Sequence, residues 1–415
     1  MSAFAYRDGE LFAEGVPLAA LADRFGTPAY VYSRAMLEDA YRRFDDAFAG
    51  TPHLVCYAVK ANSSLAILDL FARMGSGFDV VSGGELARVL AAGGDPSRVV
   101  FSGVGKTAAE METALAAGIL CFNVESAAEL DRLAAIAAKL GRRAPVSLRI
   151  NPDVDARTHP YIATGLKANK FGIAHTDALA LYRHAARLSS ISVTGIDCHI
   201  GSQITDLGAF VEAAARIFDL VDKLEAEGIA LSHVDLGGGL GVRYRDEDVI
   251  AIDAYAAAVR KAAGARRQTL LFEPGRRLVA DAGVLLTRVE YLKRGDTKNF
   301  AVVDAAMNDL LRPALYDAWH AVDPARLRNA QADEWEIVGP VCESADFLAR
   351  SRRLALEPGD LLAIRSAGAY AMAMSSNYNT RPRACEVLVD GENALPIRLR
   401  ERVEDLYAQE RLLPE

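Results

Sequence analysis

The chain has 415 residues, of which 51% are hydrophobic and 25% charged, and its formal net charge is −8 at pH 7. This length exceeds that of one ordinary compact core, so we expect two domains. The net acidity and mixed signs of charge argue against nucleic-acid or polyanion partners, which attract basic surfaces. The sequence shows no apolar run near 18 residues and no secretory leader. It therefore predicts a soluble, cytoplasmic protein without a membrane partner.

The five cysteines are scattered and show no CxxC pairing, so we expect neither a disulfide framework nor a metal site. Four of them, Cys56, Cys121, Cys198 and Cys385, lie in strand-like apolar runs and are expected in the core. Cys342 differs, because it follows Gly-Pro-Val and precedes Glu343.

The first 27 residues are short and mixed, and their sequence does not decide which domain they join. Pro28–Ser33 has the composition of a strand, and Ser33 is suited to cap a following helix. Strand-like runs then alternate with helical stretches such as Gly84–Ala92 and Ala127–Leu140. The runs are Leu54–Val59, Phe78–Ser82, Val99–Ser102, Cys121–Val124, Val146–Ile150, Val193–Ile200, His233–Leu236 and Thr269–Phe272.

Strands that alternate with helices pair in parallel. Eight such units over this length predict a (β/α)8 barrel of the TIM type, which we assign to residues 28–275. A doubly wound open sheet is the structural alternative.

After Arg277 the pattern changes to strands with few helices between them. These strands are expected at Val284–Lys293, Phe300–Asp304, Glu336–Val341, Leu361–Ser366, Ala384–Val389 and Leu395–Arg400. They predict a C-terminal β-sandwich or open β-barrel. We group residues 1–27 with residues 276–415 in this second domain.

In a parallel barrel, chemistry collects where the strands end. Lys60 ends the first apolar strand, where burial would favour the neutral, nucleophilic amine. The other expected strands lead into Asp79, Arg149, His199-Ile-Gly-Ser202, Gly237-Gly-Gly239 and Glu273-Pro-Gly275-Arg276.

Taken singly, each of these features has an ordinary structural explanation. Lys60 can extend into solvent, His199 can be a core histidine, and Ser202 can cap a helix. The glycine run can be a tight turn, and it lacks the GxGxxG spacing of a dinucleotide site. Together, a buried lysine, an imidazole, a carboxylate and a phosphate-binding loop suit a phosphorylated aromatic aldehyde. The set therefore points to pyridoxal 5'-phosphate (PLP).

With this cofactor, Lys60 is expected to form the Schiff base and Glu273 to pair with the pyridine nitrogen. His199 is expected to stack on the ring. Ser202, Gly239 and the backbone of Gly275 and Arg276 are expected to bind the phosphate.

A longer series of motifs runs through nearly the whole chain in order. It comprises Tyr57–Asn62, Phe78–Glu85, Thr158–Gly165, Lys170–Gly172, His199–Gln203, Asp235–Gly239, Glu273–Arg276, Asp309–Tyr316, Gly339–Asp346 and Gly368–Tyr370. In number, order and spacing this series resembles the fold-type III PLP-dependent decarboxylases, and most closely the diaminopimelate decarboxylase family. The resemblance implies an alanine-racemase-like barrel joined to a β domain.

The resemblance also implies roles for single residues. Asp79 and Glu85 match residues near the Schiff-base lysine, and Gly238 falls with Gly239 in the cofactor site. Tyr370 matches a tyrosine that contacts cofactor and substrate. Cys342 matches the general acid, which with Glu343 reaches the neighbouring subunit's active site. An obligate homodimer with shared sites follows.

The implied reaction converts meso-2,6-diaminopimelate to L-lysine and carbon dioxide, the last step of lysine biosynthesis by this route. Arg276, Arg312, Tyr316 and Glu343 match residues that hold the non-reacting end of the substrate. That end carries a carboxylate, which suits arginine, and an ammonium, which suits a glutamate.

Three alternatives remain open. A sister decarboxylase would act on ornithine, arginine, lysine or carboxynorspermidine, and the paired arginines argue against it. An amino-acid racemase of this fold would place an arginine where Glu273 stands. A non-catalytic PLP carrier would lack the full set that includes Lys60 and Cys342.

Overall fold

The computed structural model describes residues 3–154 and 170–414. The expected motif Thr158–Gly165 lies outside the described residues. The chain divides into two compact units. One comprises Ala40–Val242 and Glu247–Arg277, and the other comprises Met1–Asp39, Arg243–Asp246 and Leu278–Glu415.

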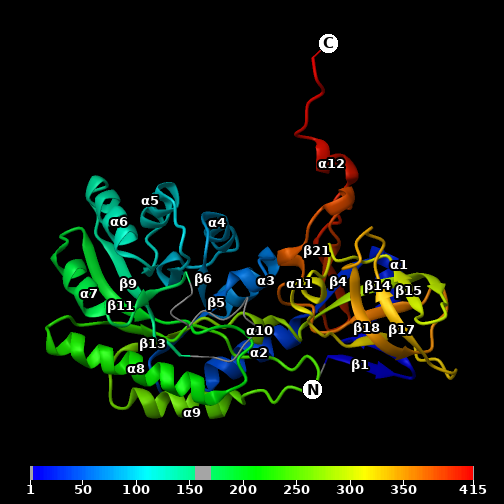
Figure 1. The fold of residues 1–415 in the computed structure, drawn as a ribbon, viewed down its shortest axis with the longest axis horizontal. Helices are drawn as coiled ribbons and strands as arrows, with labels where there is room; N and C mark the ends of the chain where they lie inside the picture. Colours follow the sequence, from blue (N-terminus) through cyan, green and yellow to red (C-terminus); the bar gives the residue numbers. More distant parts are fainter. Residues whose placement is uncertain (1–2, 155–169, 415) are drawn as a thin grey trace. The chain divides into compact units, whose positions relative to one another are not determined.

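Within the described residues, the first unit contains eight parallel strands that close into a barrel (Figure 1). Pairing runs in order around the ring, from β5 to β9 and on through β11, β12 and β13 back to β5. The strands are β5 (His53–Ala58), β6 (Gly77–Val80), β7 (Val99–Phe101), β8 (Cys121–Val124), β9 (Ala144–Asn151), β11 (Ile191–Asp197), β12 (His233–Asp235) and β13 (Thr269–Phe272). The predicted barrel is confirmed, and its closure excludes the open sheet.

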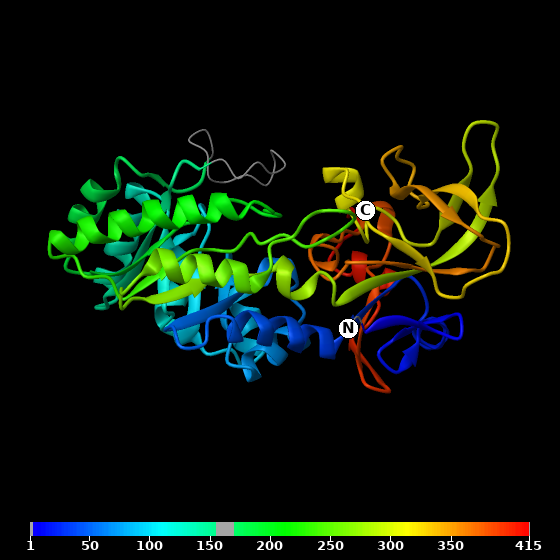
Figure 2. The ribbon, with the colours of Figure 1, turned by 90° about the horizontal axis from the view of Figure 1, so that it is seen from below.

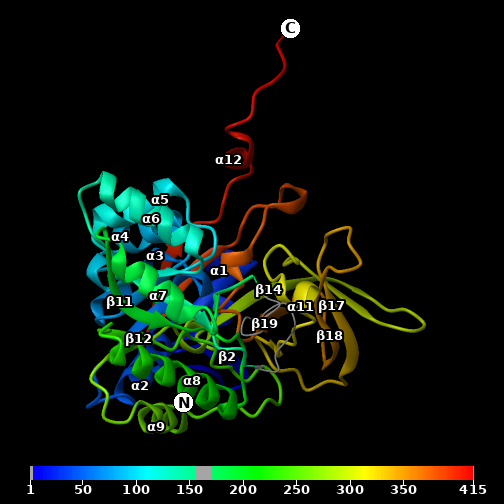
Figure 3. The same cartoon turned by 60° about the vertical axis from the view of Figure 1, so that its left-hand side comes forward.

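Helices connect successive strands and pack on their neighbours in chain order. Helices α4, α5 and α6 lie together in Figure 3, and α8 and α9 lie side by side in Figure 2. The helices are α2 (Arg34–Asp46), α3 (Leu65–Arg73), α4 (Gly83–Ala91), α5 (Ala108–Ala117), α6 (Ala127–Lys139), α7 (Ala178–Arg187), α8 (Leu207–Ala226), α9 (Ile252–Ala263) and α10 (Arg276–Val279). The short segments are η1 (Val59–Ala61), η2 (Pro96–Arg98) and β10 (Ile173–Ala174).

Local sequence explains where several of these helices begin. Thr107 and Glu110 form a reciprocal capping box at the start of α5. Ser82 and Ser126 accept hydrogen bonds from backbone N–H groups three residues later, at the starts of α4 and α6. Each cap fixes the turn that follows the carboxyl end of a barrel strand.

The barrel interior is apolar around Cys56, Val100, Cys121 and Leu271, which pack together from four strands. Polar and charged residues follow at the carboxyl ends of the strands. As expected, Cys56, Cys121, Cys198 and Cys385 are buried. This apolar floor supports a charged layer above it.

The second unit is built mainly from strands. One connected sheet has the order β18-β17-β15-β14-β4-β20-β21, and β19 pairs with β14 and β16. These strands are β4 (Ala29–Ser33), β14 (Gly283–Lys293), β15 (Phe300–Val303), β16 (Val322–Pro324), β17 (Asp333–Val338), β18 (Phe347–Leu354), β19 (Leu361–Ile364), β20 (Cys385–Asp390) and β21 (Asn393–Arg398). The short helices are α11 (Arg312–Tyr316), η3 (Met372–Met374), η4 (Tyr378–Thr380) and α12 (Val403–Tyr407).

The N-terminal segment packs on this sheet unit. It forms β1 (Phe4–Arg7), β2 (Glu10–Ala13), β3 (Val16–Pro17) and α1 (Leu18–Phe25). Its apolar residues share a core with residues from β4, β14, β19 and β20. This core accounts for the grouping of the N-terminal segment with the sheet unit, a choice that the sequence left open.

Strand β4 differs from the expected division of the chain. Residues 28–33 were assigned to the barrel domain, but β4 pairs antiparallel with β14 and parallel with β20. The compact-unit division accordingly falls at Asp39, inside α2. The fully buried composition of β4 suits a central strand of either sheet, so composition alone did not reveal its partners.

Among the described residues, no helix combines the length and apolar character needed to span a membrane.

Candidate active site

Lys60 lies in η1, directly after β5, and faces a buried carboxylate. Its Nζ atom donates to Asp79 Oδ2 at 2.6 Å. The Lys60 side chain is 36% exposed, whereas that of Asp79 is fully buried. The sequence predicted a desolvated amine, whereas this side chain keeps partial contact with solvent. The amine is therefore both reachable from solvent and held in place by Asp79.

Glu85 takes part in the start of α4. Its backbone N–H donates to Ser82 Oγ, and its carboxylate accepts from the Val81 N–H at 2.7 Å. Glu85 thereby fixes the loop that follows Asp79 on β6.

Three buried carboxyl groups meet at the ends of neighbouring strands. Asp197 ends β11, Asp235 ends β12 and Glu273 follows β13, and one oxygen from each lies within 4.8 Å of the others. Burial and the other carboxylates raise the pKa of Glu273 well above its usual range. Burial likewise raises the pKa of Asp235 to about 7. Glu273 was predicted as a site residue, whereas the inward position of Asp197 was missed.

Two neutral donors lie near Glu273. Ser102 Oγ is 3.3 Å and Asn123 Nδ2 is 3.5 Å from Glu273 Oε1. Sequence reasoning did not select either residue. In the sequence, each could have been recognised as a polar side chain near the end of an apolar strand, β7 for Ser102 and β8 for Asn123.

His199 follows β11 and is held by the glycine loop. The Gly238 N–H donates to His199 Nδ1 at 3.2 Å. Nδ1 is therefore the acceptor, so Nε2 carries the proton of a neutral ring. Desolvation, with Arg149 and Lys60 nearby, lowers the pKa of His199 well below its usual range.

The glycine loop packs closely against the barrel. A Cβ at Gly238 would lie 2.1 Å from the Glu273 carbonyl oxygen. Gly239 has φ +107°, and a Cβ there would lie 2.4 Å from the Gly201 carbonyl oxygen. The Gly238 N–H is engaged by His199, so it is not directed at an anion as the glycine-rich sequence suggested.

Arg276 and Ser202 lie beside each other at the same end of the barrel. Arg276 Nη2 donates to Ser202 Oγ at 3.0 Å, and Arg276 is buried. Gly275 is also buried, and a Cβ there would lie 3.0 Å from Ala61 Cβ, next to Lys60. A buried guanidinium with a hydroxyl partner suits an anionic ligand.

Arg149 was seen in the sequence but given no role. Its Nη1 lies 3.0 Å from Glu125 Oε1, and its Nε lies 3.8 Å from Asp197 Oδ2. Arg149 thus supplies positive charge beside the carboxylate cluster.

These residues fit PLP. The amine of Lys60 is accessible, and it is paired with Asp79. Among the described residues, the buried carboxyl of Glu273 has no ion-pair partner of its own, and its raised pKa reflects this. A protonated ring nitrogen would supply that partner. The neutral ring of His199 can face an aromatic ring without adding charge.

The sheet unit presents Cys342 and Glu343 in a tight turn after β17. Both residues are exposed. Asp346 shapes the turn, because its carboxylate accepts from the Val341 and Met307 N–H groups at 2.6 Å each. A Cβ at Gly339 would lie 2.4 Å from Asp346 Oδ2, so this position requires glycine.

Glu343 and Tyr370 have distinct surroundings in the same unit. Glu343 Oε1 accepts from the Tyr378 hydroxyl at 2.7 Å. Tyr370 is partly exposed and has φ +54°, a conformation uncommon for a non-glycine residue. Such strain is often found at functional positions.

Arg312, at the start of α11, is buried against aromatic rings. Its guanidinium carbon lies 4.8 Å from the Tyr244 ring centroid and 5.9 Å from that of Tyr316. Tyr244 also contacts His320 edge-on. Residues 243–246, which received no role from the sequence, thus belong to the sheet unit and support Arg312.

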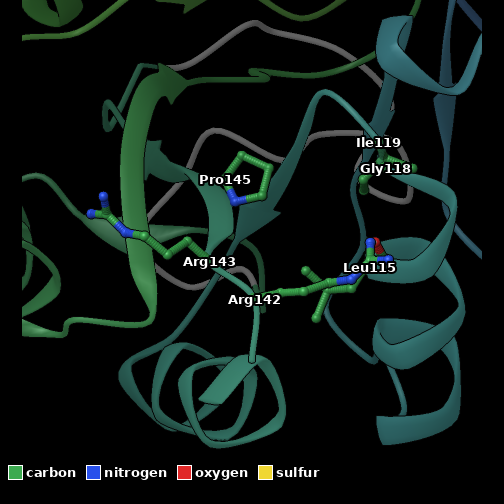
Figure 4. A pocket seen from close by; sticks show the side chains of 6 residues that line it. All are labelled: Leu115, Gly118, Ile119, Arg142, Arg143 and Pro145. Atoms are coloured by element: carbon green, nitrogen blue, oxygen red, sulfur yellow. The ribbon is translucent and has the colours of Figure 1, made fainter. Parts of the chain in front are cut away.

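A separate pocket of about 300 Å³ lies at the amino ends of β8 and β9 (Figure 4). It is lined by Leu115, Gly118, Ile119, Arg142, Arg143 and Pro145. Arg142 donates to the carbonyl groups of Leu115 and Ala116, so it caps the carboxyl end of α5. This pocket lies at the opposite end of the barrel strands from Lys60, Asp79 and Glu273.

Comparison with family models gives one match over residues 34–280, described as the pyridoxal-dependent decarboxylase, pyridoxal binding domain. This range covers more than half of the chain and includes every barrel strand.

Whole-chain relatives carry a more specific name. The diaminopimelate decarboxylase of Pseudomonas aeruginosa is 62% identical over all of both chains. A crystal structure of diaminopimelate decarboxylase from Helicobacter pylori with L-lysine has a TM-score of 0.92 at 44% identity, covering 95% of this chain and 99% of that one. The structure from M. jannaschii with L-lysine has a TM-score of 0.95 at 39% identity, covering 99% and 98%.

Proposed function

We propose that this chain, which belongs to the diaminopimelate decarboxylase family of pyridoxal-dependent decarboxylases, converts meso-diaminopimelate to L-lysine and carbon dioxide. The observation that carries the proposal is 62% identity to a diaminopimelate decarboxylase over the full length of both chains. Two solved relatives are complexes with L-lysine, the expected product. A cytoplasmic location is part of the proposal.

When bound, PLP supplies an electron sink for the electron pair released as the carboxylate leaves. In this proposal the Lys60 amine anchors the cofactor covalently. Asp79 supports the role by holding that amine at 2.6 Å. The carboxylate of Glu273 would pair with the ring nitrogen of the bound cofactor and favour its protonated form.

The remaining barrel residues orient the cofactor. His199 would pack on the cofactor ring as a neutral imidazole. Ser202, Gly239 and the backbone of Gly275 and Arg276 bind the phosphate, while Gly238 holds His199 through its N–H group. Because the His199 imidazole carries no charge, the protonation of the cofactor ring nitrogen would depend on Glu273.

Breaking the bond to the carboxylate leaves an electron pair on the substrate Cα, which must then receive a proton. We assign this proton to the Sγ–H group of Cys342 of the partner subunit. The exposure of Cys342 supports the assignment, since a buried thiol would not reach another chain. The proposal therefore includes a homodimer with shared active sites.

Substrate choice depends on the end of the molecule that does not react. Arg276 and Arg312 bind the distal carboxylate, and Glu343 binds the distal ammonium, with Tyr316 and Tyr370 beside the substrate. The aromatic rings around Arg312 support this role, because they hold a guanidinium in one orientation. A substrate without the distal carboxylate would lose its charge-assisted hydrogen bonds to these two arginines.

The test is carbon dioxide release from the purified, PLP-loaded protein. We expect release from meso-diaminopimelate and at least about a 1,000-fold lower kcat/KM with L-ornithine, L-arginine or L-lysine, because each lacks the distal carboxylate. Arg312→Met should lower kcat/KM for diaminopimelate strongly, whereas Arg350→Met, at an exposed arginine of the same unit, serves as the control.

Comparable release from a monocarboxylate would retain the cofactor and fold but would contradict the proposed substrate. The roles of Arg276 and Arg312 would then be withdrawn.

A further inference from the structure

The buried carboxyl cluster holds more negative charge than its surroundings balance. Asp197, Asp235 and Glu273 are 1%, 0% and 6% exposed. One oxygen of each lies within 4.8 Å of the others. Three ionised carboxylates at this spacing would repel strongly, because little water screens them.

Few hydrogen-bond donors reach this cluster. Ser102 Oγ and Asn123 Nδ2 lie 3.3 Å and 3.5 Å from Glu273 Oε1. Asp235 Oδ1 accepts from the Gly237 N–H at 2.8 Å. In the part of the chain that the structure describes, neither Asp235 Oδ2 nor Asp197 Oδ1 has a hydrogen-bond partner. A buried carboxylate oxygen without a donor is costly, and a retained proton relieves that cost.

The charged groups that face the cluster come from neighbouring strands and loops. The acids are Asp79 on β6 and Glu125 after β8, and the cations are Lys60 after β5 and Arg149 on β9. Each cation already contacts one of these two acids, Lys60 with Asp79 and Arg149 with Glu125. Among the described residues, the only contact that Asp197, Asp235 and Glu273 make with a cation is therefore the longer one, 3.8 Å from Arg149 to Asp197.

The other titratable neighbours are neutral near pH 7. Burial lowers the pKa of His233 to about 4, and the pKa of His199 is also lowered. Burial raises the pKa of each of the thiols Cys56, Cys121 and Cys198. These groups add no positive charge, so a proton must stay within the carboxyl cluster.

Asp235 and Glu273 belong to adjacent strand ends, because β12 lies beside β13 and the Glu273 N–H donates to the Gly237 carbonyl at 2.8 Å. Neither has an ion-pair partner among the described residues, and burial raises the pKa of both. Burial also raises the pKa of Asp197, but Asp197 differs, because Arg149 lies 3.8 Å from it and opposes that rise. The proton therefore lies between Glu273 and Asp235.

We propose that Asp235 is a positioning residue for Glu273: the two carboxyl groups share one proton, and Asp235 holds the Glu273 carboxyl where it meets the cofactor ring nitrogen. This inference rests on the proposed function, since it takes the partner of Glu273 to be PLP. By accepting the shared proton, Asp235 keeps Glu273 basic enough to hold the ring nitrogen in its protonated form.

The test compares Asp235→Asn with Asp197→Asn. Both variants remove one buried negative charge from the same cluster, but only the first removes the acceptor of the Glu273 proton. The readout is the 15N NMR shift of PLP labelled at its ring nitrogen, followed against pH in the bound state. Because a side-chain amide cannot accept that proton, we expect the pH midpoint of ring protonation to fall by about one to three units in Asp235→Asn. We expect a smaller fall in Asp197→Asn.

A second readout needs no cofactor. Ordinary Asp and Glu side chains are ionised at about pH 6, so infrared absorption of a carboxylic acid at that pH reports a retained proton. We expect the cofactor-free wild-type protein to show this absorption and Asp235→Asn to lose part of it.

Equal midpoints in the wild-type protein and Asp235→Asn, or equal shifts in both variants, would overturn the inference. So would an infrared spectrum that Asp235→Asn leaves unchanged. Failure of the cofactor assignment is distinguished at once, because the wild-type protein would then bind no PLP to be measured. Failure of the substrate assignment alone would leave both readouts unchanged.

Discussion

The Lys60 amine is both accessible and paired. Its side chain is 36% exposed although it follows an apolar strand, and its Nζ atom donates to Asp79 at 2.6 Å. Asp79 also fixes where the amine lies. Asp79, which lies 19 residues along the chain, thus positions Lys60 for bond formation.

Replacing Lys60 with Ala should abolish the visible absorbance of bound PLP, because the covalent anchor is lost. The measurement is an absorbance spectrum after PLP loading and desalting. Lys139→Ala, at an exposed lysine on α6, should retain the wild-type spectrum. An unchanged spectrum in Lys60→Ala would mean that another lysine anchors the cofactor.

Asp309 predicts a pH dependence of stability. Burial raises the pKa of Asp309 to about 6 from its ordinary 3.8. Between about pH 4 and 6 the folded protein retains a proton that the unfolded chain has released. The contribution of Asp309 to the free energy of unfolding is therefore present at low pH and is lost as pH rises through this window. The loss is up to about 3 kcal/mol.

Asp309→Asn removes this titration while keeping an oxygen that can accept from the Ala306 N–H. The measurement is the free energy of unfolding in urea. The value for Asp309→Asn minus the value for the wild-type protein should be more positive at pH 7.5 than at pH 4.5. The exposed Asp296→Asn is the control. Equal changes at both pH values would contradict the prediction.

Candidate residues with a local signal could be selected from the sequence, and those defined by strand register could not. Lys60 and Glu273 stand out because a charged side chain ends an apolar run, whereas Cys342 was given a role only through the family resemblance. Asp197 lies within a strand, and its inward direction depends on pairing with β9 and β12. Tyr244 reaches Arg312 only through the folding of residues far apart in the chain.

Among the elements, the barrel strands were predictable because they are short, apolar and separated by capped helices. Strand β18 was missed, since Arg350, Arg352 and Arg353 make Phe347–Leu354 resemble a loop. It pairs only with β17 among the described strands, so it lies at the edge of the sheet, where charged residues are tolerated. Strands β1 to β3 are four residues or fewer, too short for a clear pattern.

Strand β11 has a tight contact that predicts the effect of one substitution. A Cβ at Gly195 would lie 2.0 Å from His233 Nε2, and His233 is buried on the adjacent β12. Gly195→Ala should therefore destabilise the barrel by about 1–3 kcal/mol, as overpacking does. Urea unfolding measures this change.

The matched control is Gly105→Ala, where a Cβ would meet nothing within 4 Å. Its effect should remain within about 0.5 kcal/mol. The packing argument fails if the two variants are equally stable.

At the scale of the whole molecule, residues of the proposed site come from both units. The barrel unit holds Lys60 and Glu273, and the sheet unit holds Cys342 and Arg312. Neither unit alone contains the full set. The proposed homodimer allows the two parts of one site to come from different chains.

Mixing two inactive variants tests this sharing. Lys60→Ala and Cys342→Ala should each have little turnover, while Cys342→Ala still binds PLP. If Cys342 serves the partner's site, co-expressed or subunit-exchanged mixtures regain one working site per mixed dimer. At random pairing, this restores about a quarter of wild-type turnover. Carbon dioxide release measures it.

A mixture of two Lys60→Ala samples with different affinity tags provides the control and should regain nothing. If the mixed variants also remain inactive although tagged pull-down shows mixed dimers, Cys342 acts within its own subunit or is not the donor.

The position of β4 has a consequence for synthesis on the ribosome. Its five residues are all buried in the finished protein, between β14 and β20. Those partners are translated roughly 250 and 350 residues later, a delay on the order of 10–70 s at ordinary elongation rates. The barrel residues emerge in between and can close first. The nascent chain therefore carries β4 unpaired until β14 has emerged, and with only one of its two partners until β20 follows near the end of translation.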